Sequence, residues 1–171
     1  MQAQEAISKR HSCREFLPRP LAKDLINKLI DSARLAPTAR NVQPWEFIAI
    51  TDKGVLNKIG ALADNGPFIK DCAGCIAVLC KETKYYLEDG CAATENILLA
   101  ARNLGIASCW VAGDKKPYCS QVSNLLGVPA AFKLVSLIAL GYPESQDSFK
   151  IVDKRGLEEV IHWESFSNRV G

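Results

Sequence analysis

One apolar run, residues 74–80, constrains the fold of this chain more than any other stretch. Its sequence, Gly-Cys-Ile-Ala-Val-Leu-Cys, carries no charged side chain. Strands that are buried on both faces have nearly continuous apolar sequences, whereas strands with one wet face alternate. We therefore expect residues 74–80 to form a central strand of a sheet.

The spacing of apolar residues predicts the other elements. Strands are expected at 46–51, 106–111 and 132–140, and helices at 4–9, 21–36, 55–63, 86–104 and 117–126. Asp52 should cap the helix over 55–63, and the helix over 86–104 should be buried nearly all round. The gaps between strands are irregular, so we predict an α+β fold, a mixed sheet flanked by helices, rather than a doubly wound sheet. No glycine-rich phosphate loop follows a strand, which argues against a Rossmann site.

Length and composition fit one soluble domain over residues 1–171, with 48% hydrophobic and 23% charged residues. The net charge of +2 is too small to argue for nucleic acid or an anionic membrane. We find neither a signal peptide nor an apolar run of membrane-spanning length, and therefore expect a cytoplasmic protein. Seven cysteines, an odd number, are expected to be reduced thiols.

Two prolines enclose a loop that is rich in polar groups. Pro37 ends the preceding helical pattern, and Pro44 should hold Gln43 extended. Between them lie the hydroxyl of Thr38 and the carboxamides of Asn41 and Gln43. Carboxamides offer both donor and acceptor, which suits the edge of a heterocycle. Alternatively, the loop is simply ordered and its amides satisfy its own backbone.

A basic run over residues 9–14, Lys-Arg-His-Ser-Cys-Arg, precedes the first long helix. Guanidinium forks and a serine hydroxyl could hold a phosphate. A solvated charged turn is the alternative.

Six stretches, in order along the chain, resemble the FMN-dependent nitroreductase family. They are KRHSCREF (9–16), ARLAPTARNVQPW (33–45), ATENILLAA (93–101), GIASCW (105–110), GYP (141–143) and LEEVIHW (157–163). The resemblance covers nearly the whole chain. It implies an intertwined homodimer with FMN at the subunit interface and a C-terminal excursion.

The resemblance also implies which residues bind the cofactor. The phosphate and ribityl end would be held by Arg10, His11, Ser12 and Arg14, with Lys154 or Arg155 from the C-terminal excursion. The partner subunit's loop would line the isoalloxazine through Pro37, Thr38, Ala39 and Asn41, while Gln43 would support that loop or reach the ribityl chain. Asn96 would be a satisfied structural amide, and the strand with Cys109 and Trp110 would lie behind the flavin.

The implied activity is electron transfer from NAD(P)H through FMN to an electron-poor acceptor, such as a nitro compound, a quinone or another flavin. The order would be ping-pong, with no catalytic side chain and no metal, because the flavin carries the chemistry. The chain departs from the family pattern at Thr38, where serine is common, at Arg40, where a small residue is common, and at Gly156, where proline is frequent. This last change leaves the choice between Lys154 and Arg155 open.

Other functions are also compatible with parts of the sequence. The chain could bind FMN without turnover, as a carrier or sensor. It could dehydrogenate a peptide-bound ring, dehalogenate or fragment a flavin, although no insertion supplies a dedicated pocket. Cys72 and Cys75 form a C-x-x-C pair, typical of a dithiol or half a zinc site. They lead into a strand rather than open a helix, and no second pair completes a zinc site.

Overall fold

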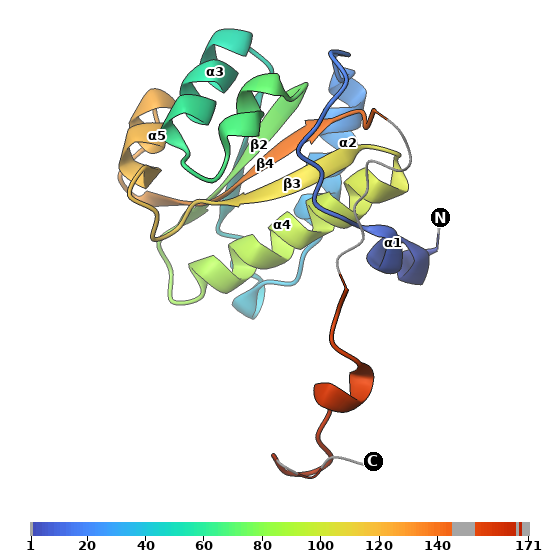
Figure 1. Cartoon of the computed structure of the whole chain (residues 1–171). Coiled ribbons are helices and arrows are strands. Elements are labelled where there is room, and N and C mark those ends of the chain that lie inside the picture. The colour runs from blue at the N-terminus through green and yellow to red at the C-terminus, as the bar shows by residue number, and fades with distance from the viewer. Residues whose placement is uncertain (1, 145–152, 167, 169–171) are drawn as a thin grey trace.

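The computed structural model of the chain describes residues 2–144, 153–166 and 168 (Figure 1). Its elements in chain order are α1 (Ala3–Lys9), α2 (Lys23–Ala33), η1 (Ala39–Asn41), β1 (Trp45–Ile50), α3 (Lys53–Leu62), η2 (Pro67–Asp71), β2 (Gly74–Lys81), α4 (Tyr86–Asn103), β3 (Ala107–Ala112), α5 (Cys119–Leu125), β4 (Phe132–Gly141) and η4 (Leu157–Glu159). The η elements are short 3₁₀ turns. All the predicted helices and strands are present, and only their ends differ.

The four strands form one sheet in the order β1-β2-β4-β3, and every neighbouring pair runs antiparallel. The apolar run over residues 74–80 lies in β2, which pairs with β1 on one side and β4 on the other. Seven of its eight residues are buried. The predicted central strand and the α+β class are therefore confirmed. An isolated parallel bridge joins Ser12 to Ser108 beside the edge strand β3.

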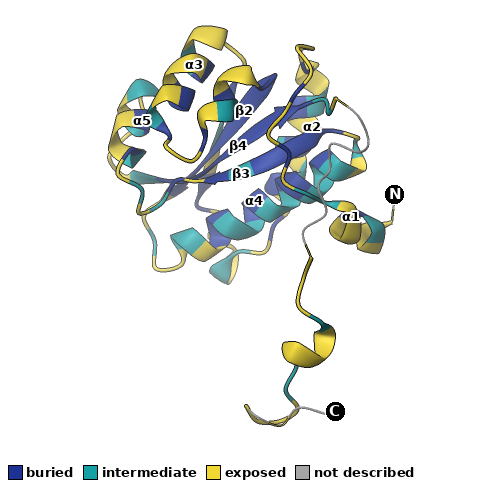
Figure 2. Cartoon of the chain, in the orientation of Figure 1, coloured by how far each residue is buried: buried dark blue, intermediate teal, exposed yellow. Residues whose placement is uncertain are grey.

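Helices cover both faces of the sheet, so β2, β3 and β4 are mostly dark blue, and hence buried, in Figure 2, whereas only the first and last residues of β1 are buried. One core lies between the sheet and the layer of α3, η2 and α5, and the other lies between the sheet and the layer of α2 and α4. Successive β2 residues enter opposite cores, because side chains alternate along a strand. Cys75 and Ala77 face the first core, and Ile76 and Val78 face the second.

Helix α4 is the longest helix of the described chain, and no residue from Asp89 to Arg102 is fully exposed. Gly90 lets the helix approach β4 closely, since a Cβ there would lie 2.7 Å from Val135 Cγ2. A buried hydrogen bond of 2.7 Å joins the hydroxyls of Thr94 and Ser136 across the same contact. The predicted burial of this helix is confirmed.

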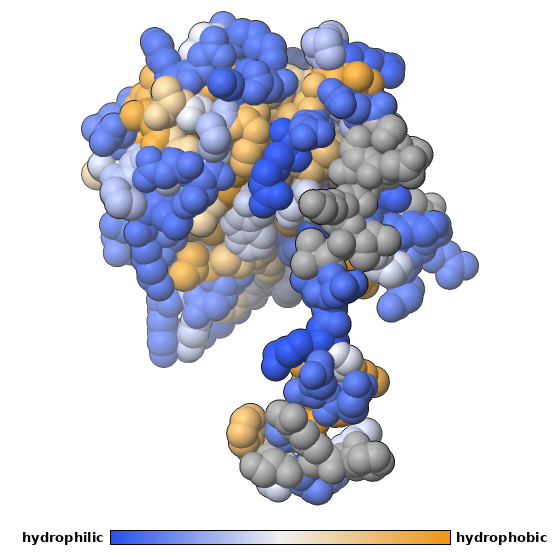
Figure 3. All heavy atoms as spheres, viewed as in Figure 1, coloured by the Kyte–Doolittle hydropathy of each residue, from blue (hydrophilic) through white to orange (hydrophobic). Residues whose placement is uncertain are grey.

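The described C-terminal segment, residues 153–166, lies away from the sheet and its helices in Figure 1. Its backbone bonds are local; for example, Gly156 N–H donates to Glu159 Oε2 at 2.8 Å. Four large hydrophobic side chains are exposed along it, and hydrophobic atoms stand beside hydrophilic ones there in Figure 3: Leu157, Val160, Trp163 and Phe166.

Over the described residues, no helix combines the length and the apolar character that crossing a bilayer requires.

Candidate functional site

The N-terminal basic segment is extended and runs beside β3. Cys13 N–H donates to Ser108 O at 2.9 Å, next to the Ser12–Ser108 bridge. Side chains alternate in extended backbone. Cys13 is therefore buried in the core, while the side chains of Arg10, Ser12 and Arg14 share the other side.

These three side chains lie along the edge strand β3 in the neighbourhood of Cys109. Burial raises the pKa of Cys109, and Arg14, a side-chain hydrogen bond with Ser12, and Arg10 all act in the opposite direction. The charges of Arg10 and Arg14 thus both act on the region of β3 around Cys109. Three of the four predicted residues in this segment therefore share one side of it, and their binding of a phosphate stays a prediction. The fourth, His11, is half-buried, with Nδ1 2.7 Å from Lys9 O.

Arg10 has a partial counter-charge. Its Nε lies 3.8 Å from Glu95 Oε1 on α4, with 25% of the Arg10 side chain and 46% of the Glu95 side chain exposed. Arg14 is exposed, and its guanidinium carbon lies 5.7 Å from the centroid of the Phe68 ring. Both cations can therefore still reach an anion from solvent.

The loop between Pro37 and Pro44 is fastened to α4 by a buried carboxylate. Thr38 Oγ1 donates to Asp89 Oδ2 at 2.9 Å, and Ala39 N–H donates to Asp89 Oδ1 at 3.1 Å. Only 5% of Asp89 is exposed. Sequence reasoning missed this residue, because an acid in the first turns of a helix is already explained by the helix dipole.

The loop backbone is left-handed at three residues that are not glycine: Arg40 (φ 56°), Asn41 (φ 56°) and Gln43 (φ 51°). The prediction that Pro44 holds Gln43 extended is therefore wrong. Proline disfavours only the right-handed helical region for the residue before it. The left-handed region therefore stays open to Gln43, and in that conformation its N–H donates to Thr38 Oγ1 at 3.2 Å. The Gln43 carboxamide lies 3.5 Å from Asn41 O, a long contact within the loop itself.

The two groups of predicted residues attach to α4 at different places. Arg10 pairs with Glu95, whereas Thr38 and Ala39 bond Asp89. Six helical residues separate these carboxylates, which is about 9 Å along the axis and a different face of the helix. The remaining predicted residues, Lys154 and Arg155, are exposed in the C-terminal segment.

Asn96 is a bonded structural amide, as the resemblance implied. Its Nδ2 donates to Ser32 O at 3.0 Å, joining α4 to α2.

The C-x-x-C pair lies in the core rather than at a reactive surface. Cys72 and Cys75 are at most 1% exposed, and burial raises the pKa of both thiols. Thiolates are the reactive form of cysteine, so this environment opposes a dithiol function. No group of three or more His, Cys, Asp and Glu side chains suited to a metal occurs in the part of the chain that the structure describes.

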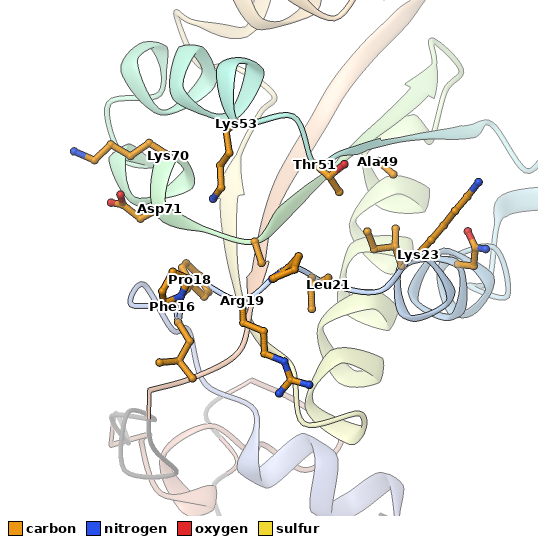
Figure 4. A pocket seen from close by; sticks show the side chains of 15 residues that line it. Phe16, Pro18, Arg19, Leu21, Lys23, Ala49, Thr51, Lys53, Lys70 and Asp71 are labelled. Carbon is orange, nitrogen blue, oxygen red and sulfur yellow. The ribbon is translucent and has the colours of Figure 1, made fainter.

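A separate cavity of about 930 Å³ opens beside the connector between α1 and α2 (Figure 4). Its lining contains none of the predicted cofactor residues. Lys53 points into it, but its Nζ already donates to Cys72 O at 2.6 Å, whereas Lys23 and Lys70 point away. The cavity is therefore distinct from the predicted flavin site.

Comparison with known proteins points to one family. The model of the nitroreductase family matches residues 7–71 and 81–142. A protein of Archaeoglobus fulgidus named "Putative NADH dehydrogenase/NAD(P)H nitroreductase" is 35% identical over 164 residues, which cover 92% of this chain and 94% of that protein. The FMN reductase (NADPH) of Bacillus subtilis is 25% identical over 162 residues, 81% of this chain and 65% of that protein.

The fold has close relatives among solved structures. A protein of Parabacteroides distasonis with the same name as the archaeal one superposes with a TM-score of 0.90 at 28% identity, over 97% of this chain and 99% of that chain.

Proposed function

The chain belongs to the nitroreductase family, and from this premise we propose that it is an FMN-dependent NAD(P)H oxidoreductase acting as a homodimer. Reduced nicotinamide would bind and leave before an electron-poor acceptor, such as a nitro compound, a quinone or a flavin, takes its place. FMN, when bound, supplies the redox chemistry of both half-reactions. The residues of the protein would bind FMN, orient it and balance its negative charge.

One observation carries the proposal: the segment with Arg10, Ser12 and Arg14 lies along the edge strand β3, joined to it by the Ser12–Ser108 bridge and by the bond from Cys13 N–H to Ser108 O. Two guanidinium groups and a short hydroxyl match the donors that a phosphate monoester needs. The residues therefore fit the phosphate end of FMN. His11 lies in the same segment, and Lys154 or Arg155 would add a further cation from the C-terminal segment.

The loop over residues 37–43 fits the ring end. Its exposed carboxamides, Asn41 and Gln43, can present both donors and acceptors to a heterocycle edge. Pro37, Thr38 and Ala39 would complete this wall, supplied by the partner subunit. Donors near the pyrimidine side of the ring stabilise negative charge on the reduced flavin. Arg40, left-handed and exposed beside them, would add positive potential there.

Two features support a dimer with the site at its interface. The predicted phosphate and ring groups bond different faces of α4 within one chain, as expected if each site draws on two subunits. The exposed hydrophobic residues of 157–166 also call for a covering surface, since monomeric proteins rarely leave a run of large apolar side chains in water. All seven cysteines are unpaired, which suits the reducing cytoplasm that we expect for this protein.

An absorbance titration tests the proposal. We expect purified protein to bind about one FMN per subunit, judged by the flavin bands after gel filtration, and the bands to bleach when NADH or NADPH is added without oxygen. Adding a nitroaromatic compound or a quinone should restore them. Bound flavin that neither nicotinamide bleaches would favour a carrier or sensor instead, and absence of flavin binding would remove the proposal.

A further inference from the structure

Asp89 lies at the centre of the contacts that shape the loop over residues 38–43. It is buried on α4, distant in sequence from the loop, and its two carboxylate oxygens accept hydrogen bonds from two consecutive loop residues. A carboxylate has only acceptors, so one oxygen for each donor is the arrangement that satisfies both. Neither oxygen is left as an orphaned buried atom among the described residues.

The contacts continue across the loop. The Thr38 hydroxyl has one hydrogen, which it donates to Asp89 Oδ2, and its oxygen accepts the Gln43 N–H. The beginning and the end of the loop are therefore joined through one hydroxyl, which is itself oriented by Asp89. We call the three bonds of Asp89, Thr38, Ala39 and Gln43 the clasp.

The clasp holds a loop backbone that is in an unfavourable conformation at three residues. Arg40, Asn41 and Gln43 all have positive φ, a conformation that residues other than glycine hold only when surrounding contacts determine it. The same shape leaves the Asn41 and Gln43 side chains exposed. Without the clasp, the loop keeps its internal turn bonds, from Asn41 N–H to Thr38 O at 3.1 Å and from Val42 N–H to Ala39 O at 3.2 Å, but loses its attachment to α4.

We propose that Asp89 is a positioning residue for the flavin ring: its buried carboxylate, through Thr38 and Ala39, holds residues 38–43 in the ring-binding shape before the ligand arrives. This role rests on the proposed function, since the loop is taken to contact FMN. Asp89 itself is too deeply buried to be a contact of the ligand. The comparisons and the sequence pattern assign it no part in the site.

The test is ligand affinity in Asp89→Asn. Asparagine keeps the shape of the side chain but turns one acceptor into a donor, so it cannot accept both loop hydrogens. We expect the Kd to rise about 10- to 100-fold, the loss of one charge-assisted bond. The rise should be equal for FMN and riboflavin, measured by quenching of flavin fluorescence, because the loop is expected to meet the ring and not the phosphate. A Kd within twofold of wild type for both ligands would overturn the inference.

Variants of Thr38 show whether the clasp acts as a unit. Thr38→Val removes the hydroxyl but keeps the size of the side chain, so it should weaken flavin binding about as much as Asp89→Asn. The double variant Asp89→Asn, Thr38→Val should lose little more than either single one, since both break the same contact. Fully additive losses would overturn the clasp. Thr94→Val is the matched control: it removes a buried hydroxyl of the same helix, bonded to Ser136, and should lower stability without changing flavin affinity.

A second readout needs no flavin. Arg40 is exposed in the loop, so trypsin cleavage after it, identified by mass spectrometry, reports the loop shape in the ligand-free protein. We expect cleavage at least about fivefold faster in Asp89→Asn than in wild type, because a loosened loop fits a protease more readily. Equal rates would overturn the clasp. Wild-type protein that binds no flavin would overturn the proposed function together with this role, whereas equal flavin binding by wild type and Asp89→Asn would overturn this role alone.

Discussion

Replacing Arg10 by alanine tests whether the N-terminal segment holds a phosphate. Three-quarters of the Arg10 side chain is shielded, with 25% exposed, and its neighbouring anion Glu95 lies 3.8 Å away with 46% exposed. A half-exposed pair at this distance stabilises the fold by at most about 1 kcal/mol, so Arg10→Ala should fold. A charge-assisted bond to a phosphate contributes about 1.5–3 kcal/mol. The Kd for FMN should therefore rise about 10- to 150-fold.

Riboflavin makes this measurement specific, because it carries the same ring without the phosphate. In a fluorescence titration, Arg10→Ala should weaken FMN binding while the Kd for riboflavin stays within about twofold of wild type. Glu95→Gln should act the opposite way and tighten FMN binding by up to about fivefold, since the carboxylate no longer competes for the guanidinium. Lys133→Ala is the matched control, because Lys133 forms a comparable surface pair with Glu82 at 3.2 Å.

Two results would refute the reasoning. Unchanged FMN affinity in Arg10→Ala would remove this residue from the phosphate site. An equal loss for FMN and riboflavin would mean that the substitution disturbs the fold or the ring site instead. Asp89→Asn differs in this respect, because an equal loss of affinity for FMN and riboflavin is the result expected for that variant.

Three further predictions concern the fold. Gly90→Ala should lower the free energy of unfolding, measured in urea, by about 1–3 kcal/mol, because the new Cβ would lie 2.7 Å from Val135 Cγ2. The loss should be smaller when Val135 is also replaced by alanine. An equal loss in that background would contradict the contact. Cys72 and Cys75 should resist iodoacetamide at pH 8 in folded protein, since burial raises both pKa values; mass spectrometry showing rapid labelling of either would contradict this. Burial and a hydrogen bond to the Asp114 carboxylate raise the pKa of Tyr86 to about 12. The pKa of tyrosine in the unfolded chain is about 10, so the neutral phenol stabilises the folded state fully below pH 10. This contribution is lost as the pH rises from about 10 to 12. Tyr86→Phe should therefore show a smaller fall in unfolding free energy over that window, and an equal fall would contradict the prediction.

The central strand of the sheet was predictable because a strand buried on both faces has a nearly continuous apolar sequence. The apolar run at 74–80 indicated a central strand, and β2 is that strand. Element ends were less predictable, since an apolar pattern can continue past the last helical hydrogen bond. The helix expected over 21–36 begins at Lys23 and ends at Ala33, where Arg34, Leu35 and Ala36 follow as turns.

The candidate site was predictable in its residue types and only partly in its geometry. A basic run was visible in the sequence, but its alternation, with Cys13 facing inward between Ser12 and Arg14, becomes clear only once the segment is seen beside β3. Asp89 could not be found by spacing, because its partners Thr38 and Ala39 are about fifty residues earlier in the chain. The long-range contact, and with it the unusual conformation of the loop, depends on the fold as a whole.

The strand order also has a consequence for how the protein is made. One neighbour of β2, β1, precedes it in the chain, but the other, β4, follows only after α4, β3 and α5, and Leu140 of β4 is the partner of Gly74. During synthesis, an apolar strand therefore emerges from the ribosome with an unpaired edge while α4, β3 and α5 are still to come. Such edges are templates for association between chains. Slow translation between β2 and β4 should therefore expose this edge for longer and favour association between unfinished chains.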